Sequence, residues 1–137
     1  MPGGRPFESL DFIYMPSSDV ARDLAFFVGL LGGELVFAIE AMGTRVAQIR
    51  LAEAGPELLL AGHLDGEAPV LVHRVEHLDA ALAALGERGV EVESRFEIPH
   101  GPIATLRAPG EQRLAVYELT RPEVPARFAG RADFGPA

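Results

Sequence analysis

The sequence contains no cysteine and no tryptophan among its 137 residues. Without cysteine, the chain can form no disulfide framework, no thiol nucleophile and no thiolate metal site. It also lacks any apolar run of membrane-spanning length, and its N-terminal sequence MPGGRPFES has no apolar core of the kind that signal peptides carry. These absences predict a cytoplasmic protein with no membrane partner.

Basic residues are scarce in this chain. Lysine and arginine together number 12 against 20 aspartates and glutamates, which gives a formal net charge of −8 at pH 7. A chain of this charge repels the phosphate backbone, so we expect no nucleic-acid partner. The acidic surface would favour a cationic small molecule, and it would equally serve solubility alone.

What the sequence does have is an internal repeat. An apolar stretch followed by an amphipathic helical pattern occupies residues 10–31, and the same order returns at residues 68–85. A repeat defines the architecture, because two similar units placed side by side leave a cleft between them. At this length the chain is one domain, residues 1–137. We divide it into module one (about 7–65), module two (about 68–120) and a C-terminal tail (121–137).

Each module is predicted to fold as a strand, a helix and three further strands. In module one, the spacing of apolar residues favours a helix over residues 20–31, ended by two glycines. The strands of module one are predicted at residues 9–15, 34–40, 44–51 and 57–64. The corresponding elements of module two are a helix over 78–85 and strands at 70–75, 90–96, 103–108 and 112–119. The tail is predicted to be irregular, with Phe128 and Phe134 available to dock it onto the domain or onto a partner subunit.

Four stretches of the sequence resemble the vicinal oxygen chelate superfamily, the group of glyoxalases, extradiol dioxygenases and bleomycin-resistance proteins. They are LDFIYMPSSDVARDLAFFVGLLGGELV, GPELLLAGH, VLVHRVEHLDAALAALGERGVEV and APGEQRLAVYEL, which together span about residues 9–120. The resemblance implies an α+β fold in which two βαβββ modules form curved mixed sheets around a central pocket. It also implies an organic small molecule as the ligand and a homodimer as the assembly.

Enzymes of that superfamily hold one divalent metal in the pocket through a His, Gln or Glu from the first and last strand of each module. The resemblance places these four positions on Phe12, Leu59, Val70 and Ala115. Hydrocarbon side chains cannot coordinate a divalent cation, which needs nitrogen or oxygen donors. We therefore expect no metal ligands and no cofactor, with a divalent metal at displaced positions as the alternative.

Strand alternation selects the side chains that share the pocket face with these positions. Beside Phe12 it selects Tyr14, Arg74 and Tyr117, and we add Gln48 from the third strand. Aromatic rings with a few polar groups suit a planar organic ligand, because the rings stack on it and the polar groups orient it. We predict that these five residues bind the ligand.

Two histidines are candidates for acid–base catalysis, because imidazole titrates near neutral pH and can move protons. His100 lies in the rigid loop EIPHGPI, and His63 ends the fourth strand. The alternatives are an exposed turn for His100 and a solvated strand end for His63. His73 is expected to face the helices, and His77 to start the second helix. Glu118 also faces the helices by alternation, where we expect an ion pair with an arginine.

Three functions are open from the sequence. The first is a metal-free protein that binds an organic small molecule, as in bleomycin-type sequestration of a basic drug. The second is a lyase, isomerase or dioxygenase of the same superfamily, using either a displaced metal site or metal-free acid–base catalysis by His100 or His63. The third is a structural or regulatory dimer without a ligand.

Overall fold

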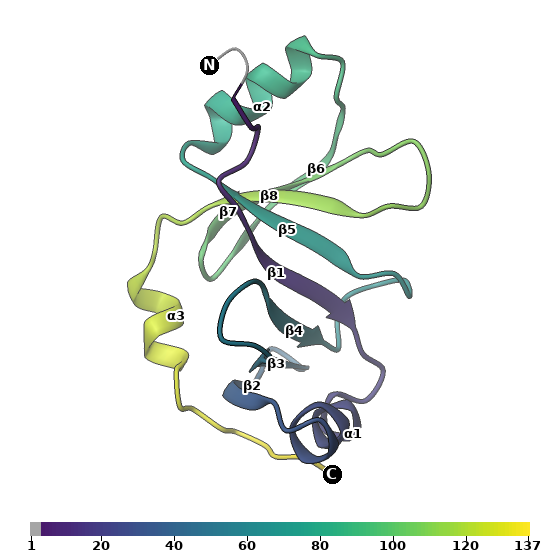
Figure 1. Cartoon of the computed structure of the whole chain (residues 1–137), viewed down its shortest axis with the longest axis vertical. Helices are drawn as coiled ribbons and strands as arrows, with labels where there is room; N and C mark the ends of the chain where they lie inside the picture. The colour runs from purple at the N-terminus through teal and green to yellow at the C-terminus, as the bar shows by residue number, and fades with distance from the viewer. Residues whose placement is uncertain (1–3) are drawn as a thin grey trace.

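The computed structural model describes residues 4–137, which form one eight-stranded mixed sheet with helices packed against it (Figure 1). The strands are β1 (Ser9–Pro16), β2 (Glu34–Ala41), β3 (Thr44–Arg50), β4 (Glu57–Ala61), β5 (Val70–Val75), β6 (Val92–Ile98), β7 (Gly101–Leu106) and β8 (Leu114–Glu118). The helical segments are α1 (Val20–Leu24), a π-helical turn η1 (Ala25–Leu30), α2 (Leu78–Glu87) and α3 (Glu123–Phe128). Every predicted strand is present, and the α+β fold is confirmed. None of the helices within residues 4–137 has both the length and the apolar character that crossing a bilayer requires.

The two modules meet at a single seam in the middle of the sheet. The strand order is β2-β3-β4-β1-β5-β8-β7-β6, and β1 pairs antiparallel with β5 where the modules join. Within each module the first strand pairs in parallel with the last, β1 with β4 and β5 with β8. The sheet is therefore continuous across both copies of the repeat, and residues of both modules lie side by side on its inner face.

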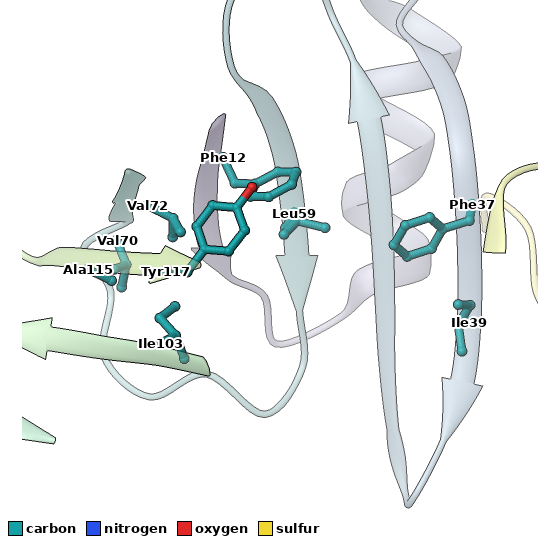
Figure 2. Packing of buried hydrophobic residues seen from close by; sticks show 9 residues of the cluster. All are labelled: Phe12, Phe37, Ile39, Leu59, Val70, Val72, Ile103, Ala115 and Tyr117. Atoms are coloured by element: carbon teal, nitrogen blue, oxygen red, sulfur yellow. The ribbon is translucent and has the colours of Figure 1, made fainter. Parts of the chain in front are cut away.

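Alternation along the strands sorts the apolar residues into clusters on the two faces of the sheet. We call the group on one face the inner cluster (Figure 2); its members are Phe12, Phe37, Ile39, Leu59, Val70, Val72, Ile103, Ala115 and Tyr117. On the other face, one cluster packs with Leu24 of α1 and another with Leu78 and Leu85 of α2. The two helices thus cover the outer face of their modules, which leaves the inner face for a site.

The first helix ends differently from the prediction. The sequence pattern predicts one helix over residues 20–31, whereas α-helical bonding stops at Leu24 and a π-helical turn follows. In this turn the backbone bonds run from residue i to i−5, as in the bond from Leu31 N to Phe26 O. Leu24, before this turn, is fully buried, whereas Leu31, after it, is exposed.

The second helix begins at a cap supplied by another element. His77 is the residue before α2, as predicted, but its side chain makes no capping bond. The amide of Leu78 instead donates to Glu118 Oε1 at 2.8 Å. A carboxylate at this position satisfies a free helix amide and complements the helix dipole. The arginine partner expected for Glu118 is thus replaced by a backbone amide.

The C-terminal tail is less irregular than predicted. It forms α3 and then a parallel bridge with β2, in which Ala132 pairs with Ala38. Phe128 packs against Phe37 with ring centroids 5.7 Å apart, and Phe134 joins the cluster under α1. The tail therefore docks on its own domain, the first of the two destinations predicted for its phenylalanines. Figure 1 shows this segment passing along one side of the molecule from the end of β8 to α1.

Replacing Leu24 with alanine tests the packing of α1 on the sheet. Leu24 is fully buried, so Leu24→Ala is expected to lower the free energy of unfolding by about 2–5 kcal/mol. Leu30→Ala, in the adjoining η1, removes a side chain that is 81% exposed; it is expected to change that free energy by less than about 0.5 kcal/mol. Urea denaturation followed by circular dichroism measures both values. Equal losses in the two variants would show that α1 is not packed in this way.

Candidate functional site

A cavity of about 260 Å³ lies on the inner face of the sheet. Its walls come from strands of both modules and from the C-terminal segment. The lining residues are Asp11, Phe12, Val36, Phe37, Gln48, Arg74, His100, Tyr117, Leu119, Pro122 and Pro125. The structure thus brings together His100 and four of the five residues predicted to bind a ligand, namely Phe12, Gln48, Arg74 and Tyr117.

Asp11 reaches this cavity because β1 carries a β-bulge. The pairing of β1 with β5 shifts just before Phe12, which breaks the alternation and lets Asp11 and Phe12 both line the cavity. Asp11 accepts a hydrogen bond of 2.5 Å from Tyr117 Oη and pairs with Arg74 at 3.4 Å. Ser9 Oγ donates to its other oxygen at 2.5 Å. One carboxylate of module one therefore orients two side chains of module two.

A second bulge shapes the wall that β2 and β3 form. The pairing of these strands shifts just before Phe37, and as a result Val36 and Phe37 both line the cavity. Beside them, Gln48 Nε2 donates to Glu57 Oε1 at 2.5 Å. Arg50 Nε donates to the other oxygen of Glu57 at 2.8 Å. Glu57 thus fixes the side-chain amide of Gln48, and Oε1 of Gln48 remains as an acceptor without a partner.

His100 is buried in the wall of the cavity, with only 6% of its surface exposed, rather than lying on an exposed turn. Its ring packs against Phe12, with centroids 5.0 Å apart, and against Tyr117 at 6.0 Å. Gly101 allows this placement, because a Cβ there would lie 2.1 Å from the carbonyl oxygen of Glu118. Only glycine lets the start of β7 approach the end of β8 so closely.

The surroundings of His100 favour a neutral imidazole. Burial is the main effect and lowers the pKa of His100 from its ordinary value of 6.5, while the Asp11 carboxylate raises it and Arg121 lowers it. Burial and the bond to Asp11 raise the pKa of Tyr117, so its phenol keeps its proton. At neutral pH the site therefore holds an imidazole able to accept a proton, next to a phenol that donates to a carboxylate.

Three of the side chains that line the cavity carry buried polar atoms without a hydrogen-bond partner. Among the described residues that line it, these atoms are both ring nitrogens of His100, Oε1 of Gln48 and Nε of Arg74. Arg74 lies 3.4 Å from Asp11, but that contact lacks hydrogen-bond geometry. Each unpaired buried polar group costs about 1–3 kcal/mol. Several such groups gathered around one cavity make this cavity the candidate functional site.

Tyr14 and His63 lie together outside the lining of this cavity. Tyr14 is farther along β1 than Phe12, and its Oη lies 3.4 Å from Nε2 of His63. Nδ1 of His63 lies 3.2 Å from Thr44 Oγ1. The structure therefore separates the candidates into two groups, and a role in ligand binding or catalysis for Tyr14 and His63 stays a prediction.

The argument from strand alternation did not predict the lining residues that lie at the bulges or in the tail. Asp11 and Val36 are turned inward by bulges, which break the two-residue period that the sequence analysis used. The available signal was Asp11 itself, the only charged residue in the apolar run SLDFIYM. Pro122 and Pro125 come from the tail, whose composition carries no pattern that indicates which side faces inward.

The positions that the resemblance assigns to a metal do not fit one. Phe12, Leu59, Val70 and Ala115 all belong to the inner cluster and are at most 9% exposed (Figure 2). Their side chains are hydrocarbon and offer no donor to a divalent cation. Within residues 4–137, no group of three or more histidines, cysteines and carboxylates is arranged to hold a metal ion.

Solved structures with the same fold include methylmalonyl-CoA epimerases. The enzyme from Mycobacterium tuberculosis is 20% identical, with a TM-score of 0.71, and the match covers 92% of this chain and 97% of that protein. A variant of the Streptomyces coelicolor enzyme in complex with 2-nitronate-propionyl-CoA is 16% identical, with a TM-score of 0.68, and the match covers 84% of this chain and 99% of that protein. A hypothetical protein from Bacillus halodurans is 18% identical, with a TM-score of 0.68, over 82% of this chain and 95% of its own.

No family model matches the sequence, and no curated protein matches it either. The fold is therefore shown by the solved structures alone. Methylmalonyl-CoA epimerases belong to the vicinal oxygen chelate superfamily, so the fold implied by the sequence resemblance is confirmed.

The buried imidazole predicts a pH dependence of stability. Because the pKa of His100 is lower in the folded chain than in the unfolded chain, protons bind preferentially to the unfolded chain below about pH 6.5. The free energy of unfolding should fall as the pH drops below that value, and part of this fall should vanish in His100→Gln. His73, whose pKa burial also lowers, is present in both proteins and cancels in the comparison.

Urea denaturation between about pH 5 and about pH 7.5 measures this difference. Asp11, Tyr117 and Arg121, the charged and titratable groups around His100, are the same in both proteins. Parallel stability profiles for the wild-type chain and His100→Gln would contradict the prediction.

Proposed function

We propose that the chain is a metal-independent isomerase or lyase that moves a proton on a small carbonyl compound, with His100 as the general base. The proposal depends above all on the buried imidazole of His100, whose two ring nitrogens have no protein partner in the wall of the cavity. A general base must be unprotonated at the working pH and within reach of the proton that it removes. Burial supports the first condition, and the adjoining cavity supports the second.

The reaction that suits these groups is removal of a hydrogen from the carbon next to a carbonyl. The C–H bond breaks, its proton forms an N–H bond on the His100 imidazole, and the electron pair moves onto the carbonyl oxygen to give an enolate. Protonation of the other face of the carbon by a water molecule gives the isomer, and the His100 imidazolium then returns its proton to the hydroxide that this leaves. Loss of a leaving group from the adjoining carbon, which takes the proton with it, gives the product of a lyase. Neither course needs an oxidant or a second substrate.

Arg74 would supply the positive charge that the enolate needs. It is the one cationic side chain among the lining residues, and its Nε has no hydrogen-bond acceptor. Asp11 lies beside the guanidinium and is itself held by Tyr117. Gln48 Oε1 offers an acceptor to a donor group of the substrate. The rings of Phe12 and Phe37 give the apolar part of the ligand its contacts.

The neighbours in fold support this class of reaction. The Mycobacterium tuberculosis and Streptomyces coelicolor proteins are epimerases, which are isomerases, and the latter is bound to 2-nitronate-propionyl-CoA. A nitronate has the planar shape and the negative charge of an enolate, so that complex shows the fold holding an anion of this form. We extend this chemistry to the present cavity, with an acyl thioester or a 2-substituted carboxylic acid as the substrate class.

A protein that binds such a compound without converting it is the second candidate. The observation in its favour is the hydrocarbon character of Phe12, Leu59, Val70 and Ala115, because the superfamily's usual metal has no ligands there. Arg74 would then anchor a ligand rather than stabilise an enolate. The two candidates differ in one measurable property, which is exchange of the substrate's hydrogen with solvent.

Hydrogen exchange into a probe compound tests the role of His100. With methylmalonyl-CoA in deuterium oxide, the wild-type protein is expected to introduce deuterium at C2, which proton NMR detects. His100→Asn should slow this exchange by about 10²–10⁴-fold, because a positioned general base contributes that much. His77→Asn, the same substitution at an exposed histidine, should leave the rate unchanged. Saturable binding of methylmalonyl-CoA without hydrogen exchange would contradict catalysis by His100 and support the second candidate, a protein that binds the compound without converting it.

Treatment with a chelator separates the metal-independent enzyme from one with a displaced metal. Since the base and the positive charge both come from side chains of the cavity, the exchange rate should survive dialysis against EDTA. Elemental analysis of the untreated protein should then show no stoichiometric zinc, manganese, cobalt or nickel. Loss of exchange on dialysis, with recovery on adding back one of these ions, would contradict metal independence.

A further inference from the structure

We infer that residues 119–134 form a strap that walls one side of the cavity and sets the largest ligand that the cavity accepts. The strap leaves the end of β8 in module two, passes through α3 and reaches β2 in module one (Figure 1). Leu119, Pro122 and Pro125 of the strap line the cavity. The inference rests on the proposed function only in that the cavity binds an organic anion, and it requires no reaction there.

The first end of the strap is fixed to module two at the turn that carries His100. The backbone carbonyl of His100 accepts hydrogen bonds from the amides of Thr120, at 3.1 Å, and Arg121, at 3.0 Å. The guanidinium of Arg121 donates to the carbonyl oxygens of Pro99 and Ile98 at 3.1 and 2.7 Å. It also donates to the side chain of Glu97 at 2.7 Å. The proposed base and the start of the strap are therefore held by the same turn.

The second end of the strap is fixed to the edge of module one. Gly130 N donates to Val36 O at 2.8 Å, and Ala38 exchanges backbone bonds with the strap through Arg131 O at 2.8 Å and Asp133 N at 2.7 Å. The carboxylate of Asp133 accepts a further bond of 2.9 Å from the amide of Glu40.

The carboxylate of Asp133 also accepts two hydrogen bonds from Arg131, each of 2.9 Å. These bonds hold the pKa of Asp133 below its ordinary value, so this anchor is charged at neutral pH. Phe134 adds a contact on the outer side, where the guanidinium of Arg45 lies 4.6 Å from its ring centroid.

The middle of the strap is held far less firmly than its ends. The short helix α3 has no buried residue, and Phe128, against Phe37, is its aromatic contact with module one. Yet this part lines the cavity, through Pro122 and Pro125. Proline rings are rigid and carry no hydrogen-bond donor, so they act on a ligand by excluding volume. The strap thus combines fixed ends with a wall that excludes ligands by their size.

The size of the cavity agrees with a limit on the ligand. The cavity that the strap bounds on one side has a volume of about 260 Å³, which suits a compact ligand.

Binding of three aromatic carboxylates of increasing size tests the inference. Benzoate, 1-naphthoate and pyrene-1-carboxylate share the anionic group that Arg74 would hold and differ in ring number. Isothermal titration with the wild-type chain should show binding of the smallest probe and at least about tenfold weaker binding of the largest, a factor typical of steric discrimination. The double variant Pro122→Ala/Pro125→Ala should reduce that ratio, since alanine shortens the wall and favours the helix. Pro109→Ala, at an exposed turn remote from the cavity lining, is the matched control.

The possible outcomes separate this inference from the proposed site. Binding of the probes with the same size dependence in the wild-type chain and in the double variant would overturn the strap as the limiting wall, and leave the site intact. Absence of saturable binding of all three carboxylates to every variant would overturn both. A changed ratio in Pro109→Ala as well would also count against the strap.

Release of the second anchor gives an independent measurement. Asp133→Ala removes the bonds to Glu40 and Arg131, so the amides of Ala38 and Gly130 should exchange with deuterium faster, and binding of pyrene-1-carboxylate should strengthen. Glu91→Ala breaks the exposed ion pair with Arg107 at 3.2 Å and is the matched control. Faster exchange without any gain in binding of the larger probe would overturn the inference.

Discussion

The hydrogen bond between Asp11 and Tyr117 is the contact on which the arrangement of the site depends. It joins a residue of module one to a residue of module two inside the cavity wall, and the same carboxylate lies beside Arg74. Hydrogen bonds to a charged group contribute about 1.5–3 kcal/mol, and loss of one partner leaves the other buried without compensation. Removing this carboxylate would leave the phenol unpaired and the guanidinium free to turn away. The positions of three lining side chains, those of Asp11, Tyr117 and Arg74, therefore depend on the bulge in β1.

The two modules share a plan, but they contribute different chemistry to the cavity. Module two supplies the base candidate His100, the cation Arg74 and the phenol of Tyr117. Module one supplies the carboxylate of Asp11 and the amide of Gln48. The repeat explains how the groups come to face one another, because β1 and β5 lie side by side at the seam. The bulge in β1 makes the result asymmetric, since it turns Asp11 of module one inward.

The sequence predicted the frame well because the frame follows from periodic patterns. The family resemblance placed Phe12, Leu59, Val70 and Ala115 on the pocket face, and the two-residue period added Tyr117; all five lie in the inner cluster. The same period failed at Asp11, since a bulge depends on how two strands pair, which one strand's sequence does not encode. The two-residue period also could not predict that Pro122 and Pro125 line the cavity, because their placement depends on where the tail docks.

Two further differences from the prediction have the same origin in contacts between distant elements. Glu118 was correctly placed on the helix side of β8, yet its partner is the amide of Leu78 rather than an arginine. His100 lies in the loop that its prolines and glycine predict, but its burial comes from the rings of Phe12 and Tyr117.

The bridge between Ala132 and Ala38 covers the backbone of β2, which would otherwise be an exposed edge strand of the sheet. At the opposite margin, among the strands described, β6 pairs with β7 alone. A sheet with two exposed edge strands can pair with further molecules at both edges. A sheet with one exposed edge strand can pair with one further molecule, and no exposed edge then remains. By bonding to β2, the C-terminal segment leaves β6 as the edge of the described sheet that is free to pair with a strand of another molecule.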